Sequence, residues 1–408
     1  MVSMPSELEE LDVRLPWLRA RSGLKWRAVR PAGIAAWIAD MDFAAPPVVR
    51  DALARLATEG DLGYPEWLHE AVPLREAFAA RMAQRYGWSP DPAEVHDFSD
   101  IIQGLQAVLH VATAPGDAVA MHLPAYPPFL ETLAAMDRRL VPVPVERSAS
   151  GWVFDPERLA RDVATAGVRA LVLVNPHNPT GRSFTRPELD AIAAVAAAHD
   201  VLVIADEVHA DLTYPGFGHT PFASISAEAA GRTVTLTSAT KAFNLAGIRC
   251  AVAHIGSAAV RGALAALPPL IFGAANVPGV TATLAAWQDA DEWLAAVLSG
   301  LDENRRYLEK ALTPLGVGYL PPDATYLAWL DCRDLGLPED PAAFFWDRAQ
   351  IKLSPGPDFA PAGHTPAIPA GLDPGTGGTG FARLNFATSG SVLAEICDRM
   401  AAALKHLC

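Results

Sequence analysis

Residues 170–209, ALVLVNPHNPTGRSFTRPELDAIAAVAAAHDVLVIADEVH, decide the fold class, because they join two continuous apolar runs through an alanine-rich stretch. The runs at 170–174 and 201–205 are apolar at every position, which is typical of strands buried on both faces. The alanine-rich stretch at 186–199 predicts a helix between them. A buried strand, a helix and a second buried strand in this order predict an α/β fold with a parallel sheet.

The same alternation extends in both directions from this unit. Two further β-rich runs lie at 234–237 and 250–255, and Pro46-Pro47 precedes a predicted helix at 48–58. After Pro278 the pattern becomes a long amphipathic helical stretch through Leu312, followed by an apolar strand at 326–330 and a C-terminal helix at 392–407.

This change of pattern predicts two domains. We expect a large domain at 46–280, a small C-terminal domain at 281–408 and an N-terminal segment at 1–45 that packs with the small domain. Residues 355–380 contain 13 Pro or Gly among 26 residues, which predicts a loop.

The composition excludes several classes of protein. With 51% apolar and 19% charged residues among 408, the chain is typical of a folded globular protein. The 32 basic and 46 acidic residues give a net charge of −14, which does not favour nucleic-acid binding. Residues 262–288 are uncharged over a length that could span a bilayer, but Pro and Gly interrupt them, so we expect no membrane span.

The cysteines, the histidines and the N-terminus complete these exclusions. None of the four cysteines has metal-ligand spacing, and no HExxH motif occurs, so we predict no metal site and reduced thiols: Cys250, Cys332, Cys397 and Cys408. The N-terminus lacks a basic patch followed by an apolar run, so we expect no signal peptide and a cytoplasmic location.

Three polar residues follow predicted strands. Lys241, one of five lysines, follows the run at 234–237, Asn178 follows the run at 170–174, and Asp206 ends the run at 201–205. Because the carboxyl ends of parallel strands meet at one sheet edge, we expect these side chains to converge. Partial burial would make Lys241 a usable amine nucleophile. On position alone, a surface lysine and a carboxylate that caps the next helix remain alternatives.

Ser238, Thr240 and Arg249 lie close to Lys241 in the sequence. Two hydroxyl groups and a guanidinium suit an anionic group such as a phosphate.

Four motifs occur in the order NPHNPTG (175–181), ADEVH (205–209), SATKAFNLAGIR (238–249) and FARLNFATS (381–389). With them the chain resembles the fold-type I pyridoxal-phosphate enzymes of the class I/II aminotransferase family over nearly its whole length. The stretch WIADMDFAAPPVV (37–49), GYP around Tyr64 and NPHNP are similar to the MalY/PatB-like branch of carbon–sulfur β-lyases, which includes cystathionine β-lyases. The resemblance implies a large domain with a mostly parallel, mixed sheet between helices and a smaller α+β C-terminal domain.

The resemblance also implies a role for each matching residue. Lys241 would hold pyridoxal 5'-phosphate covalently and move protons at the substrate Cα, and Asp206 would keep the pyridine nitrogen protonated. Asn178 would hydrogen-bond the phenolic oxygen, with His209 near the same oxygen, where many relatives have tyrosine. Tyr126 would stack on the cofactor ring.

The phosphate, the substrate and the partner subunit account for the remaining matches. The backbone N–H groups of Ile101 and Ile102 at a helix start, together with Ser238, Thr240 and Arg249, would bind the phosphate. Arg383 would bind the substrate α-carboxylate as a bidentate pair, and Asp40 is a second candidate substrate contact. Tyr64 resembles a tyrosine that a partner subunit supplies to the cofactor, which implies a homodimer with shared sites.

The implied activity is β-elimination from cysteine S-conjugates or cystathionine, which gives thiol, pyruvate and ammonia. A class I/II aminotransferase, or a decarboxylating or oxidative variant, uses the same residues and remains an alternative. Phe184 stands where relatives of the branch often have tryptophan, a departure from the lyase pattern. A regulator with a fused DNA-binding domain is disfavoured, because some 35 residues precede the first family motif.

Overall fold

The structure, a computed structural model, describes residues 11–69, 73–148, 151–268, 271–361, 378–405 and 407. Its centre is an eight-stranded sheet with the order β2-β9-β8-β7-β6-β3-β4-β5. Neighbouring strands from β8 to β4 run parallel, whereas β9 is antiparallel to β8 and β2, and β5 is antiparallel to β4. The strands are β2 (Val95–Phe98), β3 (Ala118–Leu123), β4 (Arg139–Ser148), β5 (Gly151–Phe154), β6 (Val168–Val174), β7 (Leu202–Asp206), β8 (Thr233–Thr237) and β9 (Ala251–Ile255). The expectation of a mostly parallel, mixed sheet is confirmed.

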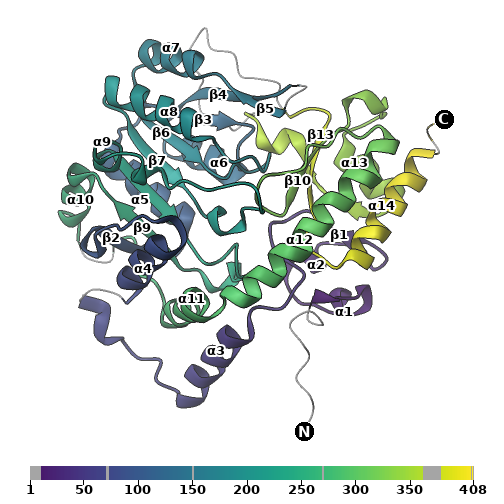
Figure 1. The fold of residues 1–408 in the computed structure, drawn as a ribbon, viewed down its shortest axis with the longest axis horizontal. Helices are drawn as coiled ribbons and strands as arrows, with labels where there is room; N and C mark the ends of the chain where they lie inside the picture. Colours follow the sequence, from purple (N-terminus) through teal and green to yellow (C-terminus); the bar gives the residue numbers. More distant parts are fainter. Residues whose placement is uncertain are drawn as a thin grey trace.

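Helices cover both faces of this sheet (Figure 1). On one face α5 (Ile101–Ala112), α6 (Pro127–Ala135) and α10 (Ala258–Ala265) contribute to one apolar core. On the other face α7 (Pro156–Ala166), α8 (Arg186–Ala198) and α9 (Ala227–Gly231) contribute to a second. A capping box between Thr185 and Glu188 begins α8, one reason why the alanine-rich run folds as a helix. Burial on both faces explains why the runs at 170–174 in β6 and 201–205 before and in β7 are apolar at every position.

The C-terminal part forms a smaller layer beside this sheet (Figure 1). A three-stranded antiparallel sheet, β10 (Leu327–Asp331), β13 (Phe381–Asn385) and β12 (Ser354–Pro355), lies there with α12 (Asp291–Leu312), α13 (Pro341–Ala349) and α14 (Gly390–Lys405). The predicted continuous helix from 278 to 312 is two helices, α11 (Val277–Asp289) and α12, with Ala290 between them. The predicted loop at 355–380 begins with a 3-10 turn, η9 (Gly356–Phe359), and its residues 362–377 lie outside the described part.

The N-terminal segment lies among the C-terminal elements, where Figure 1 shows α1, α2 and β1 beside α13 and α14. Here β1 (Ile34–Ala35) pairs in parallel with β11 (Ile351–Lys352). Before it lie α1 (Leu15–Arg19) and α2 (Leu24–Arg27), and after it α3 (Pro47–Glu59) and α4 (Leu74–Tyr86), both of which pack on α11. The domain boundaries at 45 and 280 remain predictions. The short 3-10 helices are η2 (Glu66–His69), η3 (Pro92–Glu94), η4 (Ala210–Leu212), η5 (Phe222–Ser224), η6 (Ala246–Ile248), η7 (Thr313–Leu315) and η8 (Arg333–Leu335).

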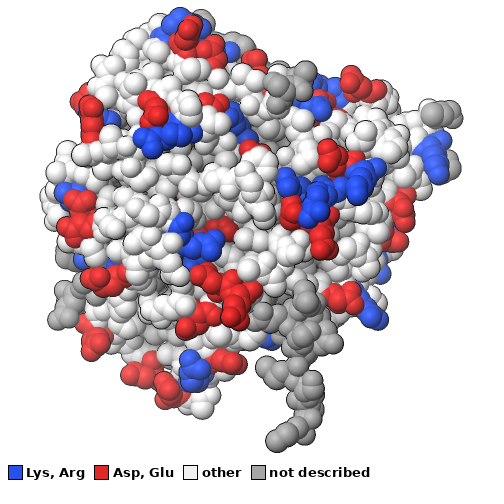
Figure 2. Space-filling view, in the orientation of Figure 1, with Lys and Arg blue, Asp and Glu red and all other residues white. Residues whose placement is uncertain are grey.

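Two surface properties bear on function. Within the described ranges, no helix is long and apolar enough to cross a membrane, and the uncharged stretch at 262–288 contributes to two separate helices, α10 and α11. On the face shown in Figure 2, Lys and Arg side chains lie next to Asp and Glu side chains and form no continuous basic surface.

Candidate functional site

The carboxyl ends of β6, β7 and β8 bring the predicted residues together. Val174 pairs with Asp206, and Asp206 pairs with Leu236, so these strands end at the same edge. Asn178 and Asp206 are buried at this edge, and Lys241 is half-buried in the turn after β8. The predicted convergence of Lys241, Asp206 and Asn178 is therefore what the fold produces.

The Asp206 carboxylate is buried with little compensation for its charge. Its Oδ1 accepts a hydrogen bond from the Val208 N–H at 3.1 Å. Burial raises the pKa of Asp206 to about 7, and this hydrogen bond opposes the shift without cancelling it. A carboxylate in this state favours a cationic N–H partner, which the pyridine nitrogen of pyridoxal phosphate supplies.

Lys241 extends toward the N-terminal segment. Its Nζ donates to the Ala39 carbonyl at 2.9 Å. Removal of the amine from water lowers the pKa of Lys241, the nearby Asp40 carboxylate opposes this, and the Arg383 charge adds to it. A lowered pKa increases the fraction of neutral amine, the form that acts as nucleophile and base.

Arg383, on β13, faces the same edge from the smaller layer. Its Nη1 donates to Asn178 Oδ1 at 3.0 Å, and its Nη2 donates to the Trp37 carbonyl at 2.9 Å and to Ser354 Oγ at 3.3 Å. The residue is 4% exposed, and this burial lowers the pKa of the guanidinium to about 10. Three acceptors on different elements thus hold the guanidinium in one orientation.

A cavity of about 700 Å³ opens beside Arg383. Its lining includes Arg383, Trp37, Tyr126 and Phe359. A substrate carboxylate bound to Arg383 would therefore have space and aromatic surface next to it.

The two ring residues predicted at the cofactor differ in environment. His209 is buried, and its Nδ1 has no hydrogen-bond partner among the described residues. Burial, together with the positive charges of Lys241 and Arg383, lowers the pKa of His209 to about 3, so the ring is neutral. Tyr126 lies half-buried at the start of α6 and lines the cavity, as a residue that stacks on a ring requires.

The predicted phosphate contacts lie at the start of α5. Ile101 and Ile102 are its first two residues, so their N–H groups have no acceptor within the helix. Asp100 caps this helix by accepting from the Gln103 N–H at 2.8 Å, and it forms an ion pair with Arg249. Sequence reasoning missed Asp100, whose carboxylate would compete with a phosphate for Arg249.

Ser238 and Thr240 lie next to each other after β8. Ser238 Oγ donates to the Cys250 carbonyl at 2.6 Å and accepts from the Thr240 N–H at 3.1 Å. These bonds fix the turn that carries Lys241, in addition to any phosphate contact.

Tyr64 and Asp40 complete the predicted set. The Tyr64 side chain lies in the loop before η2 and is 93% exposed, so it is available to another subunit. Its role in a partner's site remains a prediction. Asp40 is half-buried, and its charge acts on Lys241, which places it at the site's edge.

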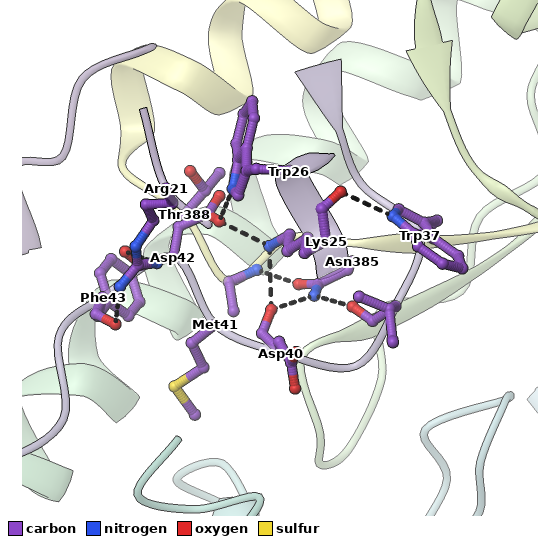
Figure 3. A network of polar contacts seen from close by, with 12 residues as sticks. Arg21, Lys25, Trp26, Trp37, Asp40, Met41, Asp42, Phe43, Asn385 and Thr388 are labelled. Atoms are coloured by element: carbon purple, nitrogen blue, oxygen red, sulfur yellow. Dashed lines mark hydrogen bonds and ion pairs between the residues drawn. The ribbon is translucent and has the colours of Figure 1, made fainter. Parts of the chain in front are cut away.

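The sequence analysis singled out Lys241 among the five lysines and did not identify Lys25 as a buried one. Lys25 is 4% exposed, and its Nζ lies 2.9 Å from Asp42 Oδ1 (Figure 3). Tyr326 was also missed, although its hydroxyl donates to the Ala39 carbonyl at 3.0 Å. The sequence did hold a signal for the burial of Lys25. Lysine is rare in this chain, and Lys25 stands next to Trp26 and close to Asp40 and Asp42.

Among the described residues, no group of three or more His, Cys, Asp or Glu side chains is arranged to hold a metal ion.

Comparison with known proteins agrees with this geometry. The profile of the family described as aminotransferase class I and II matches residues 38–399. The chain belongs to this family. Within it, this enzyme is 36% identical, over 98% of its length and 99% of the relative's, to a Mycobacterium tuberculosis protein provisionally named a cystathionine beta-lyase. It is 31% identical to cystathionine beta-lyase PatB of Bacillus subtilis, over 90% and 92% of the two chains.

A solved structure supports the same assignment. Cystalysin from Treponema denticola, which contains a pyridoxal 5'-phosphate cofactor, superposes with a TM-score of 0.87 at 26% identity, over 98% of this chain and 99% of its own. The chain is therefore a pyridoxal-phosphate-dependent enzyme of the C–S β-lyase family.

The residues present fit this cofactor. The under-compensated Asp206 carboxylate suits the pyridine nitrogen, and the unpartnered His209 Nδ1 and the Asn178 amide suit the phenolic oxygen. Lys241 would hold the aldehyde carbon. The phosphate would lie at the N–H groups of Ile101 and Ile102.

Proposed function

We propose that the enzyme is a C–S β-lyase that releases a thiol, pyruvate and ammonia from cystathionine or other cysteine S-conjugates. The observation that carries this proposal is the convergence of Lys241, Asp206 and Arg383 at one sheet edge. Similarity to proteins named cystathionine beta-lyase favours elimination as the outcome.

Pyridoxal phosphate, when bound, withdraws electrons from the substrate Cα and so makes its proton acidic. Lys241 removes that proton, because burial lowers the pKa of its amine and so increases the fraction present as the neutral base. Arg383 binds the α-carboxylate through a guanidinium that Asn178 Oδ1 and the Trp37 carbonyl orient. The thiolate leaves readily, because a thiol is far more acidic than an alcohol.

His209 contributes as a neutral hydrogen-bonding group. With a pKa of about 3, its ring adds no positive charge beside Lys241 and Arg383. Because the ring is neutral, it does not repel the positive charges of Lys241, Arg383 or the substrate amine.

We further propose a homodimer in which the exposed Tyr64 reaches the partner's cofactor. We also propose that the enzyme acts in the cytoplasm. Mixed dimers of Tyr64→Phe and Lys241→Ala subunits test the shared site, because one of the two sites in each mixed dimer retains both residues.

A substrate panel tests the reaction. Purified enzyme is supplied with cystathionine and S-ethylcysteine, and separately with each amino acid plus a 2-keto acid as amino-group acceptor. Elimination produces pyruvate, ammonia and thiol without an acceptor. Formation of the substrate's own keto acid, with the C–S bond intact and dependent on the acceptor, would instead identify an aminotransferase.

A further inference from the structure

Side chains from other parts of the chain donate hydrogen bonds to the backbone carbonyls of residues 37–43, here called the 37–43 segment (Figure 3). The segment contains no helix or strand, so its carbonyls depend on such donors. Every carbonyl from Trp37 to Phe43 accepts a side-chain hydrogen bond. The donors are Arg383 and Ser354 to Trp37, Asn385 to Ile38, Lys241 and Tyr326 to Ala39, Lys25 and Asn385 to Asp40, Asn244 to Met41, Arg21 to Asp42, and Asn244 to Phe43.

Two of these donors, Lys241 and Arg383, are the groups proposed for proton transfer and carboxylate binding. Lys241 Nζ donates to the Ala39 carbonyl at 2.9 Å, and Arg383 Nη2 donates to the Trp37 carbonyl at 2.9 Å. Arg383 can keep its bond to the Trp37 carbonyl while it binds a carboxylate, but Lys241 leaves the Ala39 carbonyl whenever it is joined to the cofactor. The remaining donors must therefore keep the segment in place during that time, so that the Ala39 carbonyl is in position when the lysine is released.

We propose that the Ala39 carbonyl is the resting acceptor of Lys241 Nζ whenever the lysine is not joined to the cofactor. We further propose that Lys25, fixed by Asp42, is the positioning residue that holds the adjoining Asp40 carbonyl and so keeps the Ala39 peptide in place. The inference rests on the role proposed for Lys241. It assigns a function to the buried Lys25–Asp42 pair, which the reaction itself does not use.

The geometry of Lys25 supports this assignment. Its Nζ donates to the Asp40 carbonyl at 2.9 Å, one residue beyond Ala39, and lies 2.9 Å from Asp42 Oδ1. The same Oδ1 accepts from Trp26 Nε1 at 2.7 Å, and the Asp42 N–H donates to the Ala387 carbonyl at 2.8 Å. Figure 3 shows Lys25 between the Asp42 carboxylate and the Asp40 carbonyl.

A positional role explains why charges occupy this site. The side chains of Lys25 and Asp42 are 5% and 1% exposed. A buried ion pair loses its hydration and is often no more stabilising than apolar residues of equal volume. The pair instead fixes a position. The Asp42 carboxylate holds the Lys25 ammonium, and the ammonium donates to the Asp40 carbonyl.

The Ala39 carbonyl has a definite use in proton transfer. When its oxygen accepts an N–H of Lys241, the nitrogen lone pair points elsewhere and is available to a substrate proton. Tyr326 donates to the same oxygen at 3.0 Å, so a second donor holds the carbonyl. Displacement of a catalytic group by about 1 Å can lower a rate on the order of 100-fold.

The test uses the double variant Lys25→Met/Asp42→Asn. It removes both charges together, leaves no buried charge unpaired and retains an oxygen acceptor for Trp26 Nε1. Asn385→Ala is a second, independent variant, because Asn385 Nδ2 donates to the Ile38 and Asp40 carbonyls at 2.6 and 2.7 Å. Arg138→Met is the matched control, since this buried cation donates to the Thr113 carbonyl at 2.9 Å, at the end of α5 away from Ile101.

Two readouts separate positioning from stability. The first is the rate at which cofactor-free protein captures added pyridoxal phosphate, followed by absorbance. The second is kcat and KM for pyruvate release from S-ethylcysteine, with the thermal midpoint as a check of folding. We expect the double variant and Asn385→Ala to capture the cofactor more slowly and to lose about tenfold in kcat, with KM changed less than about threefold.

The control should lose stability while its capture rate and kcat stay at the wild-type values. If the folded double variant captures the cofactor as fast as wild type, the proposal is wrong. If wild type releases no pyruvate, the proposed lyase function fails, and the capture rates still decide whether Lys25 positions Lys241.

Discussion

Replacement of Arg383 by lysine isolates the contribution of the guanidinium fork to substrate binding. The present side chain spreads its hydrogen bonds over Asn178 Oδ1, the Trp37 carbonyl and Ser354 Oγ, at 3.0, 2.9 and 3.3 Å. A lysine keeps one positive charge but offers a single nitrogen, so it cannot hold these acceptors and also bind a carboxylate bidentately.

The expected magnitude follows from the loss of one charge-assisted hydrogen bond to the substrate. Such a bond contributes about 1.5–3 kcal/mol, which corresponds to a rise in KM of about 10- to 150-fold. Because the α-carboxylate is unchanged during the reaction, the loss falls mainly on KM, and kcat falls less.

The assay follows pyruvate from S-ethylcysteine in a coupled reaction with lactate dehydrogenase. Arg333→Lys is the control, because Arg333 lies on the neighbouring η8, is half-exposed and pairs with Asp331. The control should keep KM within about twofold of wild type. An Arg383→Lys enzyme with an unchanged KM would refute the assignment of Arg383 to the carboxylate.

Three further changes test other parts of the site and the fold. Asp206→Asn should lower kcat about 100-fold or more while the cofactor absorbance shows that the variant is loaded, because a neutral amide cannot compensate a buried cation; wild-type kcat would contradict the role of Asp206. Burial lowers the pKa of His122 to about 3, below its unfolded value, so this histidine makes stability fall as the pH drops below 6.5. His122→Phe should remove about 1.4 kcal/mol per pH unit from that dependence in urea unfolding between pH 6 and 4, and an unaltered slope would contradict the shift. Gly181→Ala should destabilise the protein by about 1–3 kcal/mol in the same assay, because φ at Gly181 is +72° and an added Cβ would lie 2.2 Å from Pro322 Cβ; an equal unfolding midpoint would show that the turn can relax.

Much of the site could be predicted because apolar runs locate strands. The runs at 170–174 and 201–205 identified β6 and β7, and the carboxyl ends of parallel strands necessarily share an edge. Asn178 and Asp206 could therefore be placed together without a structure. Arg383 was placed by its motif, since nothing in periodicity links β13 to that edge.

The contacts of the 37–43 segment could not be predicted. They join side chains to carbonyls of irregular backbone, as in Lys241 to Ala39, and such bonds leave no periodic pattern in the sequence. Lys25 was not identified for the same reason, because its burial depends on its ion pair with Asp42, 17 residues further along the chain. The break between α11 and α12 at Ala290 was missed because the amphipathic pattern continues through it.

The most direct test of the lyase mechanism is the ratio of thiol to pyruvate released from cystathionine by wild-type enzyme and by Lys241→Ala. We predict one thiol, homocysteine, per pyruvate for wild type, with no amino-group acceptor present. For Lys241→Ala we predict the loss of both products and of the visible absorbance band. Equal product release by Lys241→Ala, or conversion of the cofactor to its pyridoxamine form without thiol, would contradict the lyase mechanism.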